Sequence, residues 1–301
     1  MTTRELTVAH LYPDVMSTHG DRGNVAAIMR RCRWRDIDVS VVELGRGDRV
    51  VPDKVDLIVI GGGGDSRQRQ IAADLYKVKG GAIRDAVAAG TAALAVGGGY
   101  ELFGRFSQPA RGVELRGIEL FDSWTIHRRR DAERLSAMAD DGTTVTSRAD
   151  AAGQDLVVRW GGGVLVGFED SAGGCTYLGA GAIPLGHVVS GRGNNGDGSE
   201  GVRLGGAVGT NLRGPCLPAN PGLADFLIKA ALRRRYGSAD LAPLPDDMER
   251  AARTAAVNRA ILGAPRRVLA WPLRRHAKAP ASAGTAARSH FSLGTRADMP
   301  Q

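Results

Sequence analysis

The chain has 301 residues, 43% of them hydrophobic and 24% charged, which is an ordinary balance for a globular protein with one large or two modest domains. It has no apolar run of about 18 residues, so a protein that spans the membrane through helices is excluded. Forty Lys and Arg against 32 Asp and Glu give a net charge of +8, so an anionic partner has to be considered.

The positive excess lies at the C-terminal end of the chain. From Ala251 onward there are nine Lys or Arg and one acid, Asp298, which leaves 31 basic and 31 acidic residues before that point. The body has no basic stripe interleaved with aromatic residues, so nucleic acid is not an expected partner. Residues 265–276 mix apolar and basic side chains and could make weak contact with an anionic membrane surface, although a solvated tail is the simpler interpretation.

Three cysteines, Cys32, Cys175 and Cys216, are far apart and form no Cys-x-x-Cys pair. We therefore expect reduced thiols, a cytoplasmic location and no metal site. The first residues lack the apolar segment of a secretory signal, in agreement with that location. No nucleotide-binding glycine motif occurs in a suitable context, so no cofactor is expected.

Strand and helix patterns alternate in the first third of the chain. Strands are expected over residues 6–12, 38–44, 55–60 and 92–96, with helices that include Val25, Gln68 and Gly81. The last two strands are almost wholly apolar, which is typical of strands buried on both faces. This order predicts a doubly wound α/β fold with a mostly parallel sheet, in which ligands bind at the carboxyl ends of the strands.

Beyond Gly104 the pattern changes to short strands, several of them separated by glycine-rich turns. They are expected at residues 117–121, 143–146, 156–160, 164–168 and 187–190, and they predict an antiparallel layer appended to the parallel core. A strand over 205–212 and an amphipathic helix over 221–236, ended by Gly237, complete residues 1–237. Residues 238–301 form a separate region, with an alanine-rich helix over 245–262 and a basic tail whose composition predicts disorder.

One apolar strand runs directly into three glycines and then into a helix pattern. A strand that turns sharply into a helix is the geometry of a nucleophile elbow, in which one side chain is held at the carboxyl edge of the sheet. The apex of a working elbow carries an oxygen or a sulfur, whereas here the apex is Gly97. The glycine-rich loop 61–65 and the strand end at 209–221 are expected at the same edge.

Several ordered motifs resemble those of one known family. They are Tyr-Pro-Asp at 12–14, Gly-Asp-Arg-Gly-Asn at 20–24, the loop 61–65, Gly-Phe-Glu-Asp at 167–170, Thr-Tyr-Leu-Gly at 176–179, Gly-Asn-Asn at 193–195, Gly-Pro at 214–215 and Asn-Pro at 220–221. Over about residues 5–236 the chain resembles the cobyric-acid-synthase-like (CobB/CobQ) class I glutamine amidotransferases, and among them the glutaminase subunits of lipid II isoglutaminyl synthases. The resemblance implies a class I glutaminase-like fold for residues 1–237.

In this family a cysteine at the elbow attacks the side-chain amide of glutamine, and a histidine transfers the proton. The resemblance places these two roles at Gly97, in Gly-Gly-Gly-Tyr-Glu instead of Cys-Gly-Gly-Tyr-Gln, and at Arg213, in Gly-Thr-Asn-Leu-Arg-Gly-Pro instead of Gly-Thr-Tyr-Leu-His-Gly-Pro. Both reactive groups are absent. Because such groups act as a unit, their loss typically lowers the rate by a factor on the order of a million, so the resemblance implies a pseudoenzyme.

Glutamine binding could outlast catalysis. The backbone N–H groups of Gly62 and Gly98 are expected to remain available to a bound oxygen, and Arg134 best matches the arginine with which the family engages glutamine, although Arg128–Arg130 compete for that match. Arg213 could pair with Asp170 or Glu101 and block the pocket, or it could attract an anion.

The same resemblance implies a heterodimer with a Mur-ligase-like synthetase subunit that amidates the glutamate of lipid II. Two alternatives stay open. The chain could be an active glutaminase with another nucleophile, such as Cys216, whose pKa a nearby guanidinium could lower. It could also be a non-catalytic binding module that acts through its basic tail. His10, His19, His127 and His187 are expected to be structural or solvated.

Overall fold

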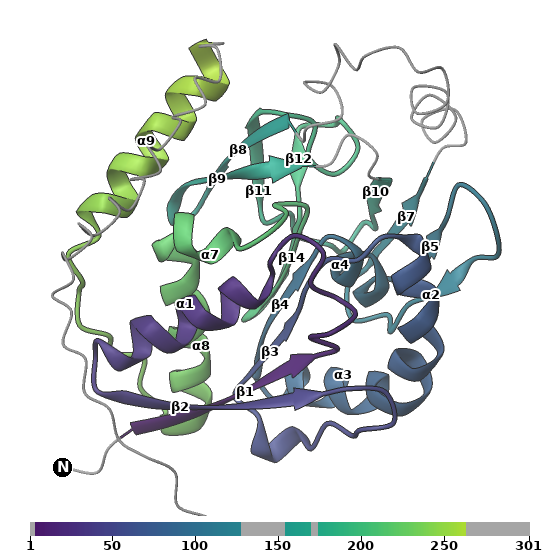
Figure 1. Ribbon diagram of the computed structural model, residues 1–301, viewed down its shortest axis with the longest axis horizontal. Helices are drawn as coiled ribbons and strands as arrows, with labels where there is room; N and C mark the ends of the chain where they lie inside the picture. The colour runs from purple at the N-terminus through teal and green to yellow at the C-terminus, as the bar shows by residue number, and fades with distance from the viewer. Residues whose placement is uncertain (1–3, 128–153, 170–173, 263–301) are drawn as a thin grey trace, which may run out of the picture. The chain divides into compact units, whose positions relative to one another are not determined.

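The computed structural model describes residues 4–127, 154–169 and 174–262 (Figure 1). All of these belong to the first of two units, Met1–Pro265. The second unit, Arg266–Gln301, and the strand expected at 143–146 lie outside the described residues. The domain boundary expected after Gly237 stays a prediction.

Six strands form the central sheet, in the order β13-β14-β4-β3-β1-β2. Their bounds are Arg4–Leu11 (β1), Ile37–Leu44 (β2), Leu57–Ile60 (β3), Ala92–Val96 (β4), Val202–Leu204 (β13) and Ala207–Thr210 (β14). Neighbouring strands are parallel except for the β13–β14 pair. Every residue of β3 and β4 is buried, as their continuous apolar runs predict. The predicted doubly wound, mostly parallel sheet is confirmed.

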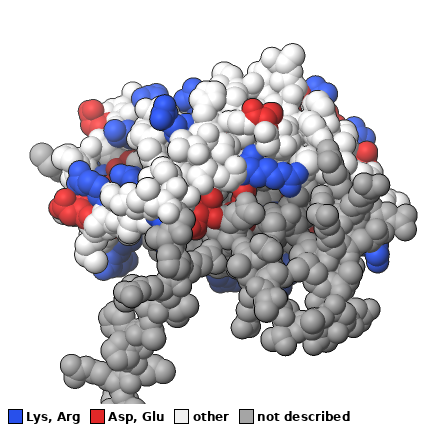
Figure 2. Space-filling model, turned by 90° about the horizontal axis from the view of Figure 1, so that it is seen from above, with Lys and Arg blue, Asp and Glu red and all other residues white. Residues whose placement is uncertain are grey.

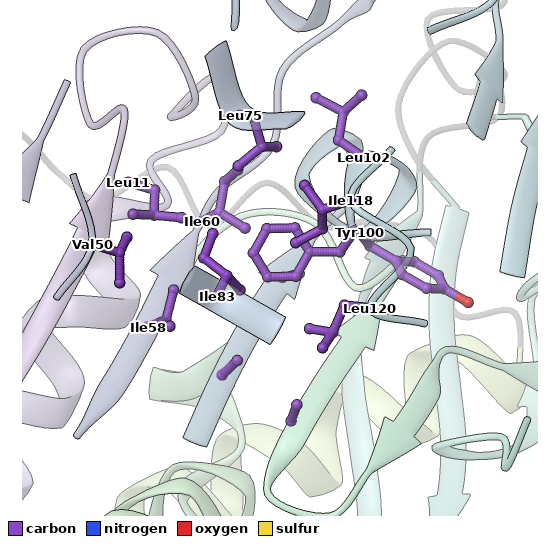
Figure 3. Packing of buried hydrophobic residues seen from close by; sticks show 14 of the residues in the cluster. Leu11, Val50, Ile58, Ile60, Leu75, Ile83, Tyr100, Leu102, Ile118 and Leu120 are labelled. Carbon is purple, nitrogen blue, oxygen red and sulfur yellow. The ribbon is translucent and has the colours of Figure 1, made fainter. Parts of the chain in front are cut away.

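Successive side chains of a strand point to opposite faces, so the sheet separates two apolar cores. One core contains Leu11, Ile58 and Ile60 together with Leu75 and Ile83, which lie side by side in Figure 3. The elements on this side are α2 (Asp65–Asp74), a π-helical turn η2 (Leu75–Lys79), α3 (Gly80–Ala88) and α4 (Gly98–Phe103). A short 3-10 turn, η1 (Pro52–Lys54), precedes β3.

The second core lies on the opposite face of the sheet, beneath α1 (Arg22–Arg33), α7 (Cys216–Ala219) and α8 (Pro221–Tyr236), as Figure 1 shows. Val25, Ile28 and Cys32 of α1 recur at helical spacing and pack into this core. Helix α8 ends as predicted, because Gly237 adopts φ 71° and donates its N–H to the carbonyl of Arg233 at 2.9 Å.

The expected antiparallel layer consists of two four-stranded sheets, β10-β7-β5-β6 and β12-β11-β8-β9. Their strands are Phe106–Gln108 (β5), Leu115–Arg116 (β6), Ser123–Ile126 (β7), Gln154–Trp160 (β8), Gly163–Glu169 (β9), Cys175–Leu178 (β10), Gly186–Ser190 (β11) and Ser199–Glu200 (β12). Only β5 and β7 pair in parallel within these two sheets. The layer is therefore confirmed, with two sheets in place of one.

The prediction of a strand at residues 117–121 is wrong. These residues form a loop whose N–H groups at Ile118, Leu120 and Phe121 donate to the carbonyls of Leu102 and Phe103 at the end of α4, each at 2.9 Å. The apolar side chains of the loop fill the core beside that helix. The apolar pattern of these residues therefore arises because they are buried against the end of a helix, and not because they pair with a strand.

The last described helix, α9, covers Asp247–Leu262 and has no buried residue. Arg259 connects it to β8 through an ion pair with Asp155 at 2.8 Å. None of the described helices is long and apolar enough to cross a bilayer. On the face shown in Figure 2, basic and acidic side chains are interspersed with uncharged surface, as the neutral composition of the body predicts.

Candidate functional site

Gly97 forms the turn between β4 and α4. Its backbone angles, φ 51° and ψ −115°, lie in a region that residues other than glycine rarely adopt. Its N–H donates to the carbonyl of Thr210 on β14, and its own carbonyl accepts from the N–H of Glu101, both at 2.9 Å. The strand, the sharp turn and the helix together make the elbow that the sequence predicts, with Gly97 at its apex.

The side chain of Arg213 lies directly beside this apex. A Cβ built on Gly97 would be 2.6 Å from Nη1 and 3.0 Å from Cζ of the guanidinium. The backbone of Arg213 is held by β9, since its N–H donates to the carbonyl of Phe168 at 2.8 Å. The two positions that the resemblance assigns to nucleophile and base are thus neighbours, and the guanidinium fills the space that a side chain at residue 97 would need.

Glycines let the neighbouring loop approach the elbow. A Cβ on Gly98 would overlap the carbonyl oxygen of Gly63, and a Cβ on Gly62 would lie 3.9 Å from Nη1 of Arg213. Gly62 and Gly98 therefore stand at the site, as expected from the sequence. Their role in binding a substrate stays a prediction.

Glu101 is a buried carboxylate in the first turn after the elbow. Its Oε2 accepts hydrogen bonds from Ser107 Oγ at 2.9 Å and from Gln68 Nε2 at 3.2 Å, and it lies 2.9 Å from Nε2 of His127. Burial by itself would raise the pKa of Glu101, but the hydrogen bond and charge of His127, followed by the charge of Arg213, outweigh burial and lower it.

His127 is the direct partner of Glu101, and no ion pair joins Glu101 to Arg213 among the described residues. Burial would lower the pKa of His127, yet the hydrogen bond and charge of Glu101 raise it overall. From the sequence, Glu101 is considered only as a possible partner of Arg213, and His127 is expected to be structural or solvated. The pairing of Arg213 with Glu101, considered from the sequence, is replaced by an ion pair between α4 and the end of β7.

Asp21 is a second buried acid at this edge of the sheet, and sequence reasoning did not single it out. It is fully buried, its Oδ2 is 3.7 Å from the place of a Cβ on Gly62, and neither carboxylate oxygen has a hydrogen-bond partner in the described part of the chain. The N–H groups of Gly62 and His19 are near enough to lower its pKa without reaching hydrogen-bond geometry. Burial is the larger effect, and it raises the pKa of Asp21.

The alternative nucleophile, Cys216, begins the short helix α7 and is 2% exposed. Burial raises the pKa of its thiol to about 12, and the charge of Asp21 adds to this rise. The lowered pKa considered from the sequence is therefore wrong, because the thiol is buried and the nearby charge that acts on it is negative. All three cysteines are free and buried.

Other predicted site residues lie outside the described residues. These are Arg134, the competing Arg128–Arg130, Asp170 and the basic tail, so the roles expected for them stay predictions. Within the described ranges, no three His, Cys, Asp or Glu side chains come together in a group that could hold a metal ion.

Comparisons with known proteins agree with the motifs. Residues 7–221 match the family described as the CobB/CobQ-like glutamine amidotransferase domain. The chain is 33% identical over 233 residues to the GatD subunit of lipid II isoglutaminyl synthase (glutamine-hydrolyzing) from Staphylococcus aureus, which covers 77% of this chain and 86% of that protein. The protein of the same name from Streptococcus pneumoniae is 28% identical over 245 residues, covering 81% and 87%.

Solved structures are more distant in sequence. PurLQS from Thermotoga maritima is 13% identical, with a TM-score of 0.45 over 77% of this chain and 99% of the other. A glutamine amidotransferase from the same organism is 11% identical, with a TM-score of 0.41 over 87% and 94%. The family match covers most of the chain, and its span agrees with the run of motifs read from the sequence. The chain belongs to the CobB/CobQ-like glutamine amidotransferase family.

Proposed function

We propose that this chain is a GatD-type subunit that keeps the amidotransferase fold and does not hydrolyse glutamine. The observation that carries the proposal is the 2.6 Å between Nη1 of Arg213 and the position of a Cβ on Gly97. The elbow has no nucleophilic atom at its apex, and a cation occupies the adjoining space. The thiol nucleophile and the imidazole base of a thiol amidase are therefore both missing from these two positions.

Arg213 cannot replace a histidine as a base. A guanidinium has five N–H donors, has no acceptor, and keeps its proton in proteins. It can stabilise negative charge, but it cannot accept a proton from a nucleophile and return it to a leaving amine. The substitution therefore removes proton transfer as well as imidazole.

Among the described residues, no neighbouring group replaces the nucleophile. Cys216 is buried with a raised pKa, so its thiolate is scarce at neutral pH. Ser107, Glu101 and His127 lie together, but the hydroxyl of Ser107 donates to the carboxylate and not to the imidazole. Ser107 is also only 1% exposed, so this group is not a serine–histidine–acid arrangement.

The similarity to GatD subunits of lipid II isoglutaminyl synthase supports a place in the amidation of lipid II as one subunit of a complex. We further propose that the partner is the Mur-ligase-like synthetase subunit that the motif resemblance implies, and that the two chains act in the cytoplasm. In that assembly the chain would contribute its fold and its partner surface without releasing ammonia itself. Co-expression with such a synthetase subunit and recovery of the two chains as one species tests this part of the proposal.

The loss of hydrolysis is tested by ammonia release from L-glutamine, with the purified chain alone and with the synthetase subunit. We expect no release above a protein-free blank, and none from the single variants Gly97→Cys and Arg213→His. The double variant restores both groups, so we expect measurable release from it. Release by the unmodified chain that Cys216→Ala abolishes would contradict the proposal and identify the thiol as the nucleophile.

A further inference from the structure

Arg213 carries a buried charge to which the described residues supply no partner. The residue is 8% exposed, its Nε is buried without a hydrogen bond, and none of its guanidinium nitrogens forms an ion pair or hydrogen bond with any residue in the ranges that the structure describes. A buried ion is costly unless an opposite charge and hydrogen bonds compensate it. The side chain is thus incompletely satisfied in the free protein.

The other buried cations of the chain show the contrast. Arg31 pairs with Asp225 and Asp246, both at 2.7 Å. Arg35 is as buried as Arg213 and pairs with Asp225 at 2.8 Å, and the fully buried Lys79 pairs with Asp74 at 2.6 Å. The fold therefore supplies a carboxylate to each of these three, whereas none of the described carboxylates pairs with Arg213.

Two described acids beside the site, Glu101 and Asp21, do not take that role. Glu101 already accepts from Ser107 and Gln68 and pairs with His127 at the same oxygen, so its charge acts on Arg213 only from a distance. Neither carboxylate oxygen of Asp21 forms a hydrogen bond with a described residue, so Asp21 is not in direct contact with the guanidinium. An anion that reached Arg213 would meet guanidinium N–H donors that the described carboxylates leave free.

We propose that Arg213 makes the elbow a binding site for a small carboxylate, with the two oxygens of the ligand seated on the guanidinium beside Gly97. The inference rests on the proposed function, since it takes the ligand to be held and not hydrolysed. A guanidinium pairs with a carboxylate in a bidentate manner. It cannot accept from the NH₂ of a carboxamide, so the site prefers a carboxylate to the matching amide.

L-Glutamate and L-glutamine are the probes, because they differ only in this terminal group. Isothermal titration calorimetry and thermal unfolding of the full chain, at constant ionic strength, compare the two. We expect glutamate to bind about tenfold more tightly than glutamine or better, and to raise Tm as its concentration increases. Equal affinity for the two probes, or no binding of glutamate, would overturn the inference.

Substitution of the arginine localises the effect. Arg213→Gln abolishes the preference for glutamate, whereas Arg116→Gln, at an exposed arginine paired with Glu119, leaves it unchanged. Without ligand, Arg213→Gln unfolds at a temperature at least as high as the unmodified chain, because an unpaired buried charge is removed. A large fall in Tm for this variant would show that Arg213 has a protein partner, and would overturn the inference.

Arg213→Lys keeps the charge and loses the bidentate fork, so we expect weaker glutamate binding and a smaller preference over glutamine. Inorganic phosphate tests the kind of anion, because phosphate binding as tight as glutamate binding, with the same dependence on Arg213, would contradict a carboxylate site. Ammonia release is followed in parallel. Release from glutamine contradicts the proposed function, whereas absence of both release and glutamate binding contradicts only this inference.

Discussion

Nε2 of His127, at the end of the strand pairing that joins β5 to β7, lies 2.9 Å from Oε2 of Glu101 in the helix that follows the elbow. Glu101 is 4% exposed, and the same oxygen also accepts hydrogen bonds from Ser107 and Gln68. This ion pair places a titratable contact beside the candidate site. Its pH dependence can be stated from the two pKa shifts.

The pair should stabilise the fold in a limited range of pH. The folded-state pKa of His127 is raised above 6.5, so its contribution is complete below that pH and is lost as the pH rises through the folded pKa. The pKa of Glu101 is lowered below 4.5, so its contribution is present above that pH and is lost as the pH falls through the folded pKa. Between the folded-state pKa of Glu101 and that of His127, the carboxylate and the imidazole are both charged.

We therefore expect His127→Gln to lower the free energy of unfolding by about 3 kcal/mol near pH 5.5, because a buried carboxylate loses its cation. The difference from the unmodified chain should narrow above the folded pKa of His127. Urea unfolding between pH 5 and 9 measures it. His187→Gln, at an exposed histidine, is the control with a small and constant effect. A pH-independent difference for His127→Gln would contradict the ion pair.

A side chain at the elbow apex should be destabilising for two separable reasons. Gly97→Ala places a Cβ at an unfavourable φ of 51° and within 2.6 Å of Arg213 Nη1, so we expect a loss of about 1–3 kcal/mol in the free energy of unfolding. The backbone part remains in an Arg213→Ala background, but the steric part disappears. A double-mutant cycle by denaturant unfolding measures this coupling, and strict additivity would contradict the contact.

Asp225 on α8 forms ion pairs with Arg31 on α1 and with Arg35 just after it. These buried pairs should contribute more to the free energy of unfolding than exposed ion pairs do. Asp225 accepts from Arg31 and Arg35, which are 4% and 8% exposed, so Asp225→Asn leaves two buried guanidinium groups short of a counter-charge. We expect a loss of about 3–5 kcal/mol. The matched control is Asp14→Asn, whose partner Arg22 is exposed, with a change below about 1 kcal/mol. Similar losses in both variants would show that burial of the arginines is not the cause.

Thiol accessibility gives an independent check on Cys216. Cys32, Cys175 and Cys216 are 0%, 3% and 2% exposed, and burial raises the pKa of Cys32 as well as that of Cys216 to about 12. An aromatic disulfide reagent should therefore label almost no thiol in the native protein and all three in denaturant. Rapid native labelling that is lost in Cys216→Ala would support the thiol as a reactive group.

Elements with strong local signals were predictable from the sequence. The strand at 92–96 and the helix at 221–236 have the predicted bounds. A continuous apolar run marks the buried strand, and a proline at the start and a glycine after the end mark the limits of the helix. The loop at 117–121 was not predictable in this way, since its apolar residues are buried by the end of α4 and not by a neighbouring strand. Apolar patterning reports burial and does not specify which element provides it.

The sequence by itself determined the family, the order of strands and helices in the parallel core, and the absence of a thiol at position 97 and an imidazole at position 213. Only the tertiary structure decided that Glu101 pairs with His127, that the guanidinium of Arg213 lies beside Gly97, and that Cys216 is buried with a raised pKa. The reason is physical. Residue identity is local, whereas the partner of a buried charge depends on how segments distant in sequence pack together and exclude water.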